Sequence, residues 1–424
     1  MAARLVVRDF LSITSADIEL STLTVVIGPS ASGKSVLSKL AFFFNELFNE
    51  QWQVLEESKG LDHFKTHVKE KFKEWFPVQA WGQGKFQLEF YAGEFQVRIS
   101  RIEYRKKLGE NMRVWFSPYF EEQYNAALAM AKQASRLSDD AVESHRAMAV
   151  SYELRENVRK LNRRRLGENF SESQVFIPAG RSFFTSIGKS IVAFEHGRIL
   201  DPLILRFGRF YSSLRERRFM PPLSRAASHL ASKLDAIMSG TLVFERNKEY
   251  LKTADGRRVP LSAMSSGQQE LMPLMVALKS RIGYAERFGL RQQIFIEEPE
   301  AHLFPSAQST LVEVLSHFIA LSKGRSKLMV TTHSPYVLAK INNLIKARGV
   351  AGRKGSRRHS EIQEIVKEEY WLDGSKVNAY AIQAGVVTRI QDEDDGMIEA
   401  DYLDEVSGQI ALEFSRILGV EYSR

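Results

Sequence analysis

The chain contains no cysteine, and this absence excludes several classes of protein. Disulfide frameworks, zinc sites with cysteine ligands, iron–sulfur clusters and cysteine nucleophiles all need a thiol. Long apolar runs are also missing. The most apolar early run, residues 40–48 (LAFFFNELF), is far shorter than the roughly 20 residues of a membrane-spanning helix. The start, MAARLVVRDF, lacks the pattern of a signal peptide. We therefore expect a soluble, cytoplasmic protein that makes no contact with a membrane.

The size and charge of the chain leave room for large cores and for a polyanionic partner. The sequence has 424 residues, of which 44% are hydrophobic, enough for two or three domains. Lys and Arg together number 59 against 51 for Asp and Glu, which gives a net charge of +8. This excess suits a DNA or RNA partner without requiring one, since a solvated basic surface has the same composition.

Four short strings occur in a fixed order along the chain. They are GPSASGKS (28–35), MSSGQQE (264–270), FIEEPE (295–300) and TTHS (331–334). Any one of them alone could occur by chance in a protein that binds no nucleotide. Together they supply the groups needed to hold a nucleoside triphosphate and to cleave it between two copies of one protein. ATP is therefore the first ligand to consider.

The first string fits the P-loop pattern G-x-x-x-x-G-K-[ST] in full. A β-rich run at 22–27 precedes it, and helical spacing of apolar residues follows at 35–48, which is the context that a P-loop requires. Lys34 is expected to reach the β- and γ-phosphates, and Ser35 to hold Mg²⁺. A simple glycine turn before a helix is the weaker interpretation, because the later motifs accompany it. The predicted nucleotide-binding residues are Gly28, Pro29, Ser30, Ala31, Ser32, Gly33, Lys34 and Ser35.

Two adjacent acids end an apolar strand at 293–296. We assign Glu297 to the metal shell and Glu298 to the attacking water, because a buried strand end is where a magnesium site and a general base are needed. The alternative is a pair of surface acids capping a helix, for which Pro299 would suit the first turn.

The remaining two strings also lie at the ends of predicted elements. His333 follows an apolar strand at 328–330, where it can contact the γ-phosphate and the water, although a lone histidine is more often structural. Ser265 and Ser266 are natural N-cap residues, and Gly267 allows close backbone approach. A helix N-terminus of this kind is an anion site. On this stretch alone, a capped helix without a ligand is the preferred interpretation.

The motifs in this order resemble those of the ABC-type ATPase heads. MSSGQQE looks like the signature motif of that family, FIEEPE like its Walker B motif and TTHS like its switch histidine. The resemblance implies ATP and Mg²⁺ as cofactors, catalysis by Glu298, His333 and Lys34, and two heads packed head to tail as a homodimer or a higher even-numbered oligomer. It also implies that the signature acts in trans, on ATP held by the partner's P-loop, through Ser265, Ser266, Gly267 and Gln268.

Finer details resemble one branch of that family. EEPEAHLFP (297–305), SSGQQEL and VFIPAGRSFF (175–184) are similar to bacterial ATPases related to the heads of overcoming-lysogenization-defect (OLD) nucleases and to ATPase subunits of anti-phage systems, and more distantly to SMC and RecF heads. The match covers about 5–48 and 240–339. Ala31, Ser266 and Glu297 depart from the usual glycine, glycine and aspartate. Arg181 is a candidate for phosphate or interface contact, and a plain surface arginine is an equal alternative.

We predict an α/β fold, namely an ABC-type P-loop head with a mixed sheet, an antiparallel β subdomain and helical insertions. Gly240 to Pro260 is expected to form two strands, and 369–372 a further strand. The predicted segments are the P-loop part of the head (1–48), a helical segment (49–84), a hairpin or meander (85–118), a helical insertion (119–170), a return strand and loop (171–189), a second helical insertion (190–239), the C-terminal part of the head (240–345), a mobile basic loop (346–364) and a β/α tail (365–424) that ends in a helix at 402–418.

The leading functional hypothesis is an ATPase that controls a separate effector, a nuclease or toxin, in prokaryotic anti-phage defence. The tail is too short for a nuclease domain of its own. The first alternative is a DNA-repair or chromosome-maintenance ATPase that grips DNA directly through two basic clusters, 155–165 and 346–358. A transporter ATPase is a further alternative that the motif details disfavour.

Overall fold

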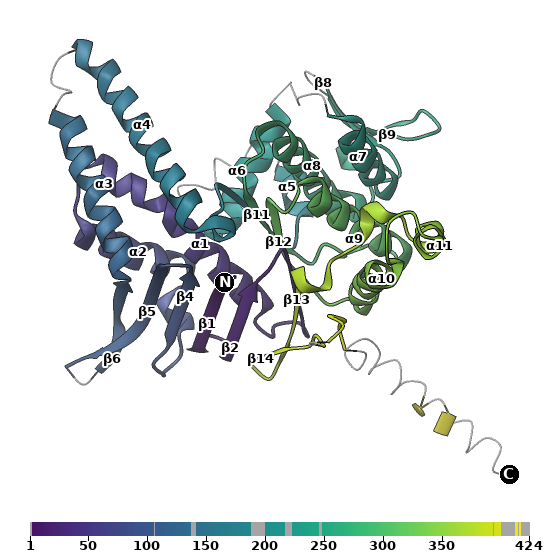
Figure 1. Ribbon diagram of the computed structural model, residues 1–424, viewed down its shortest axis with the longest axis horizontal. Coiled ribbons are helices and arrows are strands. Elements are labelled where there is room, and N and C mark those ends of the chain that lie inside the picture. The colour runs from purple at the N-terminus through teal and green to yellow at the C-terminus, as the bar shows by residue number, and fades with distance from the viewer. Residues whose placement is uncertain are drawn as a thin grey trace.

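The protein is described by a computed structural model (Figure 1). The described residues are 2–105, 107–136, 141–187, 200–216, 223–245, 248–392, 394–399, 412–413 and 415–416. The predicted helix at 402–418 therefore lies almost wholly outside the described residues. The predicted α/β fold class is confirmed.

One mixed sheet of eleven strands runs through the described part of the chain. In spatial order its strands are β6 (Lys107–Phe116), β5 (Phe95–Tyr104), β4 (Gln87–Ala92), β1 (Ala3–Phe10), β2 (Ile13–Leu20), β14 (Val386–Arg389), β13 (Val377–Gln383), β3 (Leu23–Ile27), β12 (Ser326–Thr332), β11 (Gln292–Glu297) and β7 (Ser173–Ile177). Neighbours from β13 to β7 pair in parallel, whereas β6 to β2 form an antiparallel wing. The wing joins the parallel half through β2 and β14.

The parallel strands are buried on both faces, as their continuous apolar sequences predict. Ile294 and Ile296 of β11 face one hydrophobic core, and Phe295 between them faces the other. Strand β12 repeats this alternation at Leu328, Met329 and Val330. The two-residue period of a strand therefore divides its side chains between two cores.

Helices cover both faces of the parallel half. On one face lies α1 (Lys34–Glu56), and beside it α2 (Leu61–Trp75) and α3 (Pro118–Arg136) cover the antiparallel wing. On the other face lie α5 (Ser182–Ile187), α6 (Pro202–Glu216), α7 (Arg225–Ile237), α8 (Ser266–Phe288), α9 (Pro305–Leu321) and α10 (Pro335–Ala351). The middle of α1 is apolar all round, since Phe42, Phe43 and Phe44 are each fully buried. Helices α3 and α4 (Ala141–Arg165) form an antiparallel pair that projects from the body (Figure 1).

Three expectations about local structure were wrong. Residues 346–364 are mostly helical rather than a mobile loop, because α10 continues to Ala351 on buried apolar residues and Ser356 caps α11 (Arg357–Ile365). The stretch 240–260 contains three strands, not two: β8 (Thr241–Glu245), β9 (Lys248–Lys252) and β10 (Arg258–Pro260) form a small separate sheet. Residues 368–370 form a 3₁₀ turn instead of a strand.

The parallel arrangement brings four loops to one edge of the sheet. The carboxyl ends of β3, β12, β11 and β7 lead into residues 28–33, 333–334, 298–304 and 178–181 respectively. Ligand sites of open α/β sheets form at this edge, because consecutive parallel strands end there together. None of the helices within the described residues is long and apolar enough to cross a membrane.

Candidate nucleotide site

The P-loop wraps tightly because glycine occupies its most crowded position. Gly33 has φ 109°, and a Cβ there would lie 2.7 Å from Ser12 Oγ. Ala31 also has a positive φ, 60°, which L-residues adopt at a cost of about 1 kcal/mol. This strain gives a physical reason for the glycine that the resemblance implies at this position.

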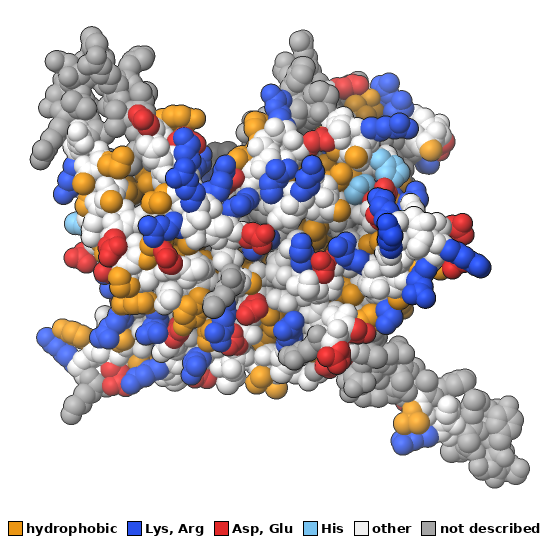
Figure 2. Space-filling view, viewed as in Figure 1, with side chains coloured by type: hydrophobic (Ala, Val, Ile, Leu, Met, Phe, Trp, Pro, Cys, Tyr) orange, Lys and Arg blue, Asp and Glu red, His pale blue; other side chains and the backbone are white. Residues whose placement is uncertain are grey.

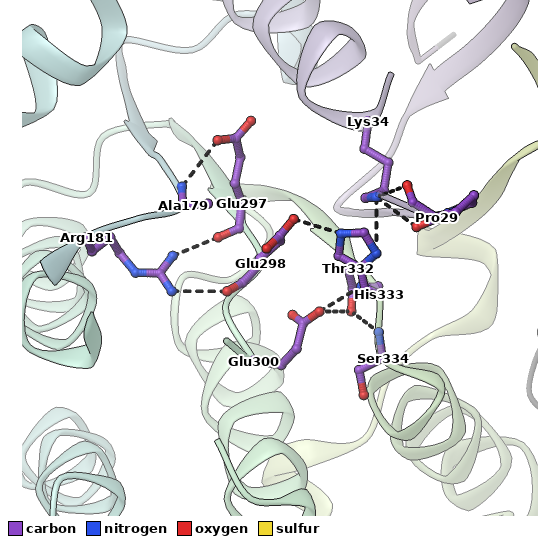
Figure 3. Close-up of polar contacts among 11 residues, drawn as sticks. Pro29, Lys34, Ala179, Arg181, Glu297, Glu298, Glu300, Thr332, His333 and Ser334 are labelled. Atoms are coloured by element: carbon purple, nitrogen blue, oxygen red, sulfur yellow. Dashed lines mark hydrogen bonds and ion pairs between the residues drawn. The ribbon is translucent and has the colours of Figure 1, made fainter. Parts of the chain in front are cut away.

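The side chain of Lys34 turns back into the loop that carries it. Its ammonium donates to Gly28 O and Pro29 O, both at 2.7 Å, and lies 3.4 Å from His333 Nδ1 (Figure 3). Burial lowers the pKa of Lys34, against the opposing influence of Glu298, Glu300 and Glu297. The Lys34 ammonium therefore lies near three acids, and its positive charge is what would attract a phosphate to the loop.

Glu298 and His333 face each other across the same space. His333 Nε2 lies 2.8 Å from Glu298 Oε1, and both side chains are about one third exposed. Glu298 has φ 43°, in the left-handed region that costs a non-glycine residue roughly 1–3 kcal/mol. Backbone strain of this kind concentrates at functional sites, and here it belongs to the residue that we predicted to be the general base. The three predicted catalytic residues thus form one connected chain of contacts.

Glu297 points to the other side of β11, toward the start of α1. Its side chain is 5% exposed and accepts a hydrogen bond from Ala179 N at 3.3 Å. Burial raises the pKa of Glu297, while the nearby Ser35 hydroxyl and Ala179 N–H act to lower it. Glu297 Oε1 makes no well-formed hydrogen bond to any residue that the structure describes.

A divalent cation fits the surroundings of Glu297. A buried carboxylate oxygen without a donor needs a positive charge to offset its desolvation. Carboxylate and hydroxyl oxygens are also the ligands that Mg²⁺ prefers. Glu297 and Ser35, the two predicted metal ligands, are the residues that would hold it.

A third acid, Glu300, holds the switch histidine from behind. Its Oε1 accepts a hydrogen bond from Thr332 Oγ1 at 2.6 Å and another from His333 N at 2.7 Å. The Thr332 hydroxyl in turn accepts from Ser334 N at 2.9 Å. Glu300 is 7% exposed, so these bonds are shielded from water. Glu300 thus fixes the backbone that presents the His333 ring.

The signature string forms the N-terminus of α8. Ser265 caps the helix, because its hydroxyl accepts from Gln268 N while Gln268 Oε1 accepts from Ser265 N. Gln268 also donates to Met238 O, so its side chain is committed to its own chain. Ser265 and Ser266 are exposed. Within the described ranges, no hydrogen bond or ion pair connects the signature residues to the P-loop of the same chain.

Arg181 is neither a surface arginine nor free to contact phosphate, so both expectations for it were wrong. It is fully buried, and its guanidinium donates to Pro178 O, Glu270 O, Glu297 O and Glu298 O. Prediction failed here because burial depends on the packing of β7, β11 and α8 against one another. Glu270 and Glu300 were missed as well, although each lies within one of the four strings.

The P-loop follows β3, the histidine follows the neighbouring strand β12, and the two acids follow β11 beyond it. This arrangement defines an ABC-type P-loop ATPase head. Residues 23–339, well over half of the chain, match the family described as "AAA domain, putative AbiEii toxin, Type IV TA system". The chain belongs to this family, which confirms the predicted relationship to AAA-group ATPases of ABC type.

Solved structures similar to this chain include heads of SMC proteins. An SMC head bound to the C-terminal winged-helix domain of ScpA has 13% identity and a TM-score of 0.43, with 92% of this chain and 97% of that one covered. The SMC head of Thermotoga maritima has 14% identity and a TM-score of 0.37, with 93% and 100% covered. An SMC head with an extended coiled coil bound to the C-terminal domain of ScpA from Pyrococcus furiosus has 13% identity and a TM-score of 0.38, with 96% and 98% covered. No curated protein matches the sequence.

Proposed function

We propose that this protein binds ATP with Mg²⁺, closes into a head-to-tail homodimer around it, and hydrolyses it to release the dimer. The observation that carries the proposal is the contact chain from Lys34 through His333 to Glu298 at the sheet edge where Glu297 and Ser35 meet. In this assignment Lys34 binds the β- and γ-phosphates, and Glu298 accepts a proton from the attacking water. His333 orients that water. Bound Mg²⁺ would neutralise charge on the phosphate oxygens.

Exposed aromatic side chains beside the catalytic loops support the closed dimer. Phe304 follows the Walker B loop and is 77% exposed, and Tyr336 follows the switch histidine and is 56% exposed. A Cβ on Gly267 would lie 3.6 Å from His302, so the signature and the Walker B loop are neighbours. Exposed large aromatics near a site are typical of interface anchors. A second copy would bury them as it brings its signature to the phosphate.

The work of the cycle is assigned to a separate effector, a nuclease or toxin, in anti-phage defence. The resemblance to OLD-related heads and defence ATPases supports this assignment. To control an effector, the ATPase needs only to switch between an open and a closed dimer, because the effector can respond to that change.

Direct DNA binding has less support, because many of the candidate cations have acidic partners. In the first basic cluster Arg155, Arg159, Arg163 and Arg165 pair with acids, and in the second Lys346, Arg348, Lys354 and Arg357 do. Figure 2 shows Lys and Arg side chains spread over the visible face with Asp and Glu among them. Salt-sensitive DNA binding by the isolated protein would reverse this ranking.

Two variants test the ATPase assignment. Lys34→Ala should abolish ATP binding, and unchanged affinity would refute the P-loop assignment. Glu298→Gln should retain ATP and accumulate as a dimer in size-exclusion chromatography with ATP and Mg²⁺. Hydrolysis at the wild-type rate by Glu298→Gln would show that Glu298 is not the general base.

A further inference from the structure

A single buried cation connects three segments that serve different parts of the proposed ATP cycle. Arg181 lies just beyond β7, and its side chain is fully buried. Its guanidinium reaches Glu297 O at 2.7 Å and Glu298 O at 3.0 Å, at the end of the Walker B strand. Its Nε reaches Glu270 O in α8 at 3.2 Å (Figure 3 shows the first two contacts). The arginine therefore touches the backbone of both site acids without touching the site itself.

The contact with α8 is reciprocal. The Glu270 carboxylate accepts from the backbone N–H of Arg181 at 2.7 Å and of Ser182 at 2.8 Å. Glu270 Oε1 also lies 3.5 Å from Arg181 Nε. The side chain of each residue thus binds the backbone of the other. We call this arrangement, formed by Arg181 and Glu270, the clamp.

The stability of the fold does not by itself require a buried ion pair at the position of the clamp. Burial acts to raise the pKa of Glu270, yet the two N–H donors and the Arg181 charge together lower it. Burial also lowers the pKa of Arg181, against the acids around it. A well-packed apolar pair is often as stable as a buried ion pair or more so. A directional link between backbones is what the charged pair supplies and an apolar pair does not.

Because Glu270 lies in α8, the clamp is connected to the signature residues at the N-terminus of that helix. Ser265 caps α8 and is exposed, and Glu270 lies five residues later on the same helix, 3% exposed. In a head-to-tail dimer that end of α8 faces the ATP of the partner subunit. Glu298 lies at the proposed ATP site of its own subunit. The two ends of the clamp therefore belong to different ATP sites.

We propose that Arg181 is a positioning residue that transmits the engagement of the signature helix at one ATP site to the catalytic glutamate of the other. This rests on the proposed head-to-tail dimer. Closure on one ATP would then place Glu298 for hydrolysis of the second, so that hydrolysis is cooperative in ATP concentration. Coupling between sites of this kind typically changes an equilibrium by about 5- to 150-fold.

Steady-state hydrolysis and nucleotide binding test the clamp in the full-length protein. Arg181→Lys keeps the charge but lacks the planar fork that spans several carbonyls. Glu270→Gln keeps the size of the side chain and one acceptor oxygen. It tests the same contact if Arg181→Lys does not fold. For both variants we expect kcat to fall by about tenfold or more. The Hill coefficient should fall toward 1, and the Kd for a fluorescent ATP analogue should stay within about threefold, since the P-loop is untouched.

A matched control separates positioning from general loss of structure. Arg215 is also a largely buried arginine paired with a glutamate, Glu249, but it lies in α6 away from the four loops. Arg215→Lys should leave the Hill coefficient unchanged whatever it does to thermal stability. If both lysine variants lower kcat alike with the Hill coefficient retained, the clamp is merely structural and the proposal is overturned.

Mixed dimers locate the effect in one subunit. In a dimer with a single Glu298→Gln subunit, Arg181→Lys should lower turnover more when it lies in the subunit that keeps Glu298, because Arg181 acts on its own chain. Equal loss in both arrangements overturns the proposal. Non-cooperative hydrolysis by a wild-type dimer also overturns it while leaving the proposed function intact. Failure of the wild-type protein to dimerise with ATP overturns both.

Discussion

Replacing Glu300 should uncouple ATP binding from hydrolysis. One oxygen of the Glu300 carboxylate accepts hydrogen bonds from the Thr332 hydroxyl and from the His333 backbone N–H. Both donors lie at the end of β12, where Thr332 is fully buried. Without the acid, the turn that presents His333 would lose its anchor, while the P-loop would keep all of its contacts.

The size of the effect follows from the two bonds. A hydrogen bond to a charged group contributes roughly 1.5–3 kcal/mol, so Glu300→Ala, which leaves both donors buried and unpaired, should lower the free energy of unfolding by roughly 3–6 kcal/mol. Glu300→Gln keeps an acceptor oxygen in place but loses the charge, and should cost about 1–3 kcal/mol. If misplacement of His333 raises the activation free energy by only about 1.4 kcal/mol, kcat falls about tenfold.

The measurements are urea unfolding without nucleotide, titration of a fluorescent ATP analogue, and steady-state hydrolysis. For Glu300→Gln we expect a kcat at least about tenfold lower and an ATP Kd within about threefold of wild type. Glu313→Gln is the control, because Glu313 is also a partly buried acid that accepts from two side chains, Lys233 and Lys340, but lies within α9. Wild-type stability and kcat in Glu300→Ala would refute the reasoning.

Three further predictions concern acid stability, the dimer face and the P-loop. His67 and Lys71 hold the pKa of Glu50 at about 2 despite its burial, so Glu50 stabilises the fold above its unfolded pKa and loses that effect as pH falls toward 2. Glu50→Gln should therefore lower the free energy of unfolding by about 2–3 kcal/mol at pH 7, and the difference from wild type should shrink below about pH 4.5 in unfolding titrations; a difference independent of pH would contradict this. Phe304→Asp should prevent ATP-dependent dimerisation in a Glu298→Gln background, whereas Ile365→Asp, at a residue equally exposed on α11, should not; dimers of both would exclude Phe304 from the interface. Gly33→Ala should weaken ATP binding by about tenfold or more because of its positive φ and the approach to Ser12, and wild-type affinity in an analogue titration would show that the loop adapts.

Local signals in the sequence predicted that the two acids, the P-loop and the histidine lie at strand ends, and the structure places them there. Each of these residues ends a strand with a continuous apolar sequence, and a parallel strand can bury both faces only with helices on each side. Their convergence on one sheet edge then follows, because parallel strands end together. The sequence patterns also predicted the antiparallel wing, although not that β14 would join it to the parallel half.

Predictions failed where a residue's role depended on distant packing. The glycines at 349, 352 and 355 suggested a loop, yet burial of the apolar face of α10 keeps the helix intact to Ala351. The local sequence does not indicate that Arg181 is buried, since all of its partners except Pro178 lie 89 to 117 residues further along the chain. Propensity and spacing report only near neighbours, so long-range contacts of this kind remain invisible to them.

By itself, the sequence determined which groups are proposed to bind phosphate, hold a cation and activate water, and that these groups follow apolar strands. Only the tertiary structure decided how those groups are supported. It placed Glu300 behind His333 and buried Arg181 between the end of β11 and the signature helix α8. The physical reason is that a buried polar group must find its partners wherever the packed elements bring them, and the sequence order of those elements does not specify which ones meet.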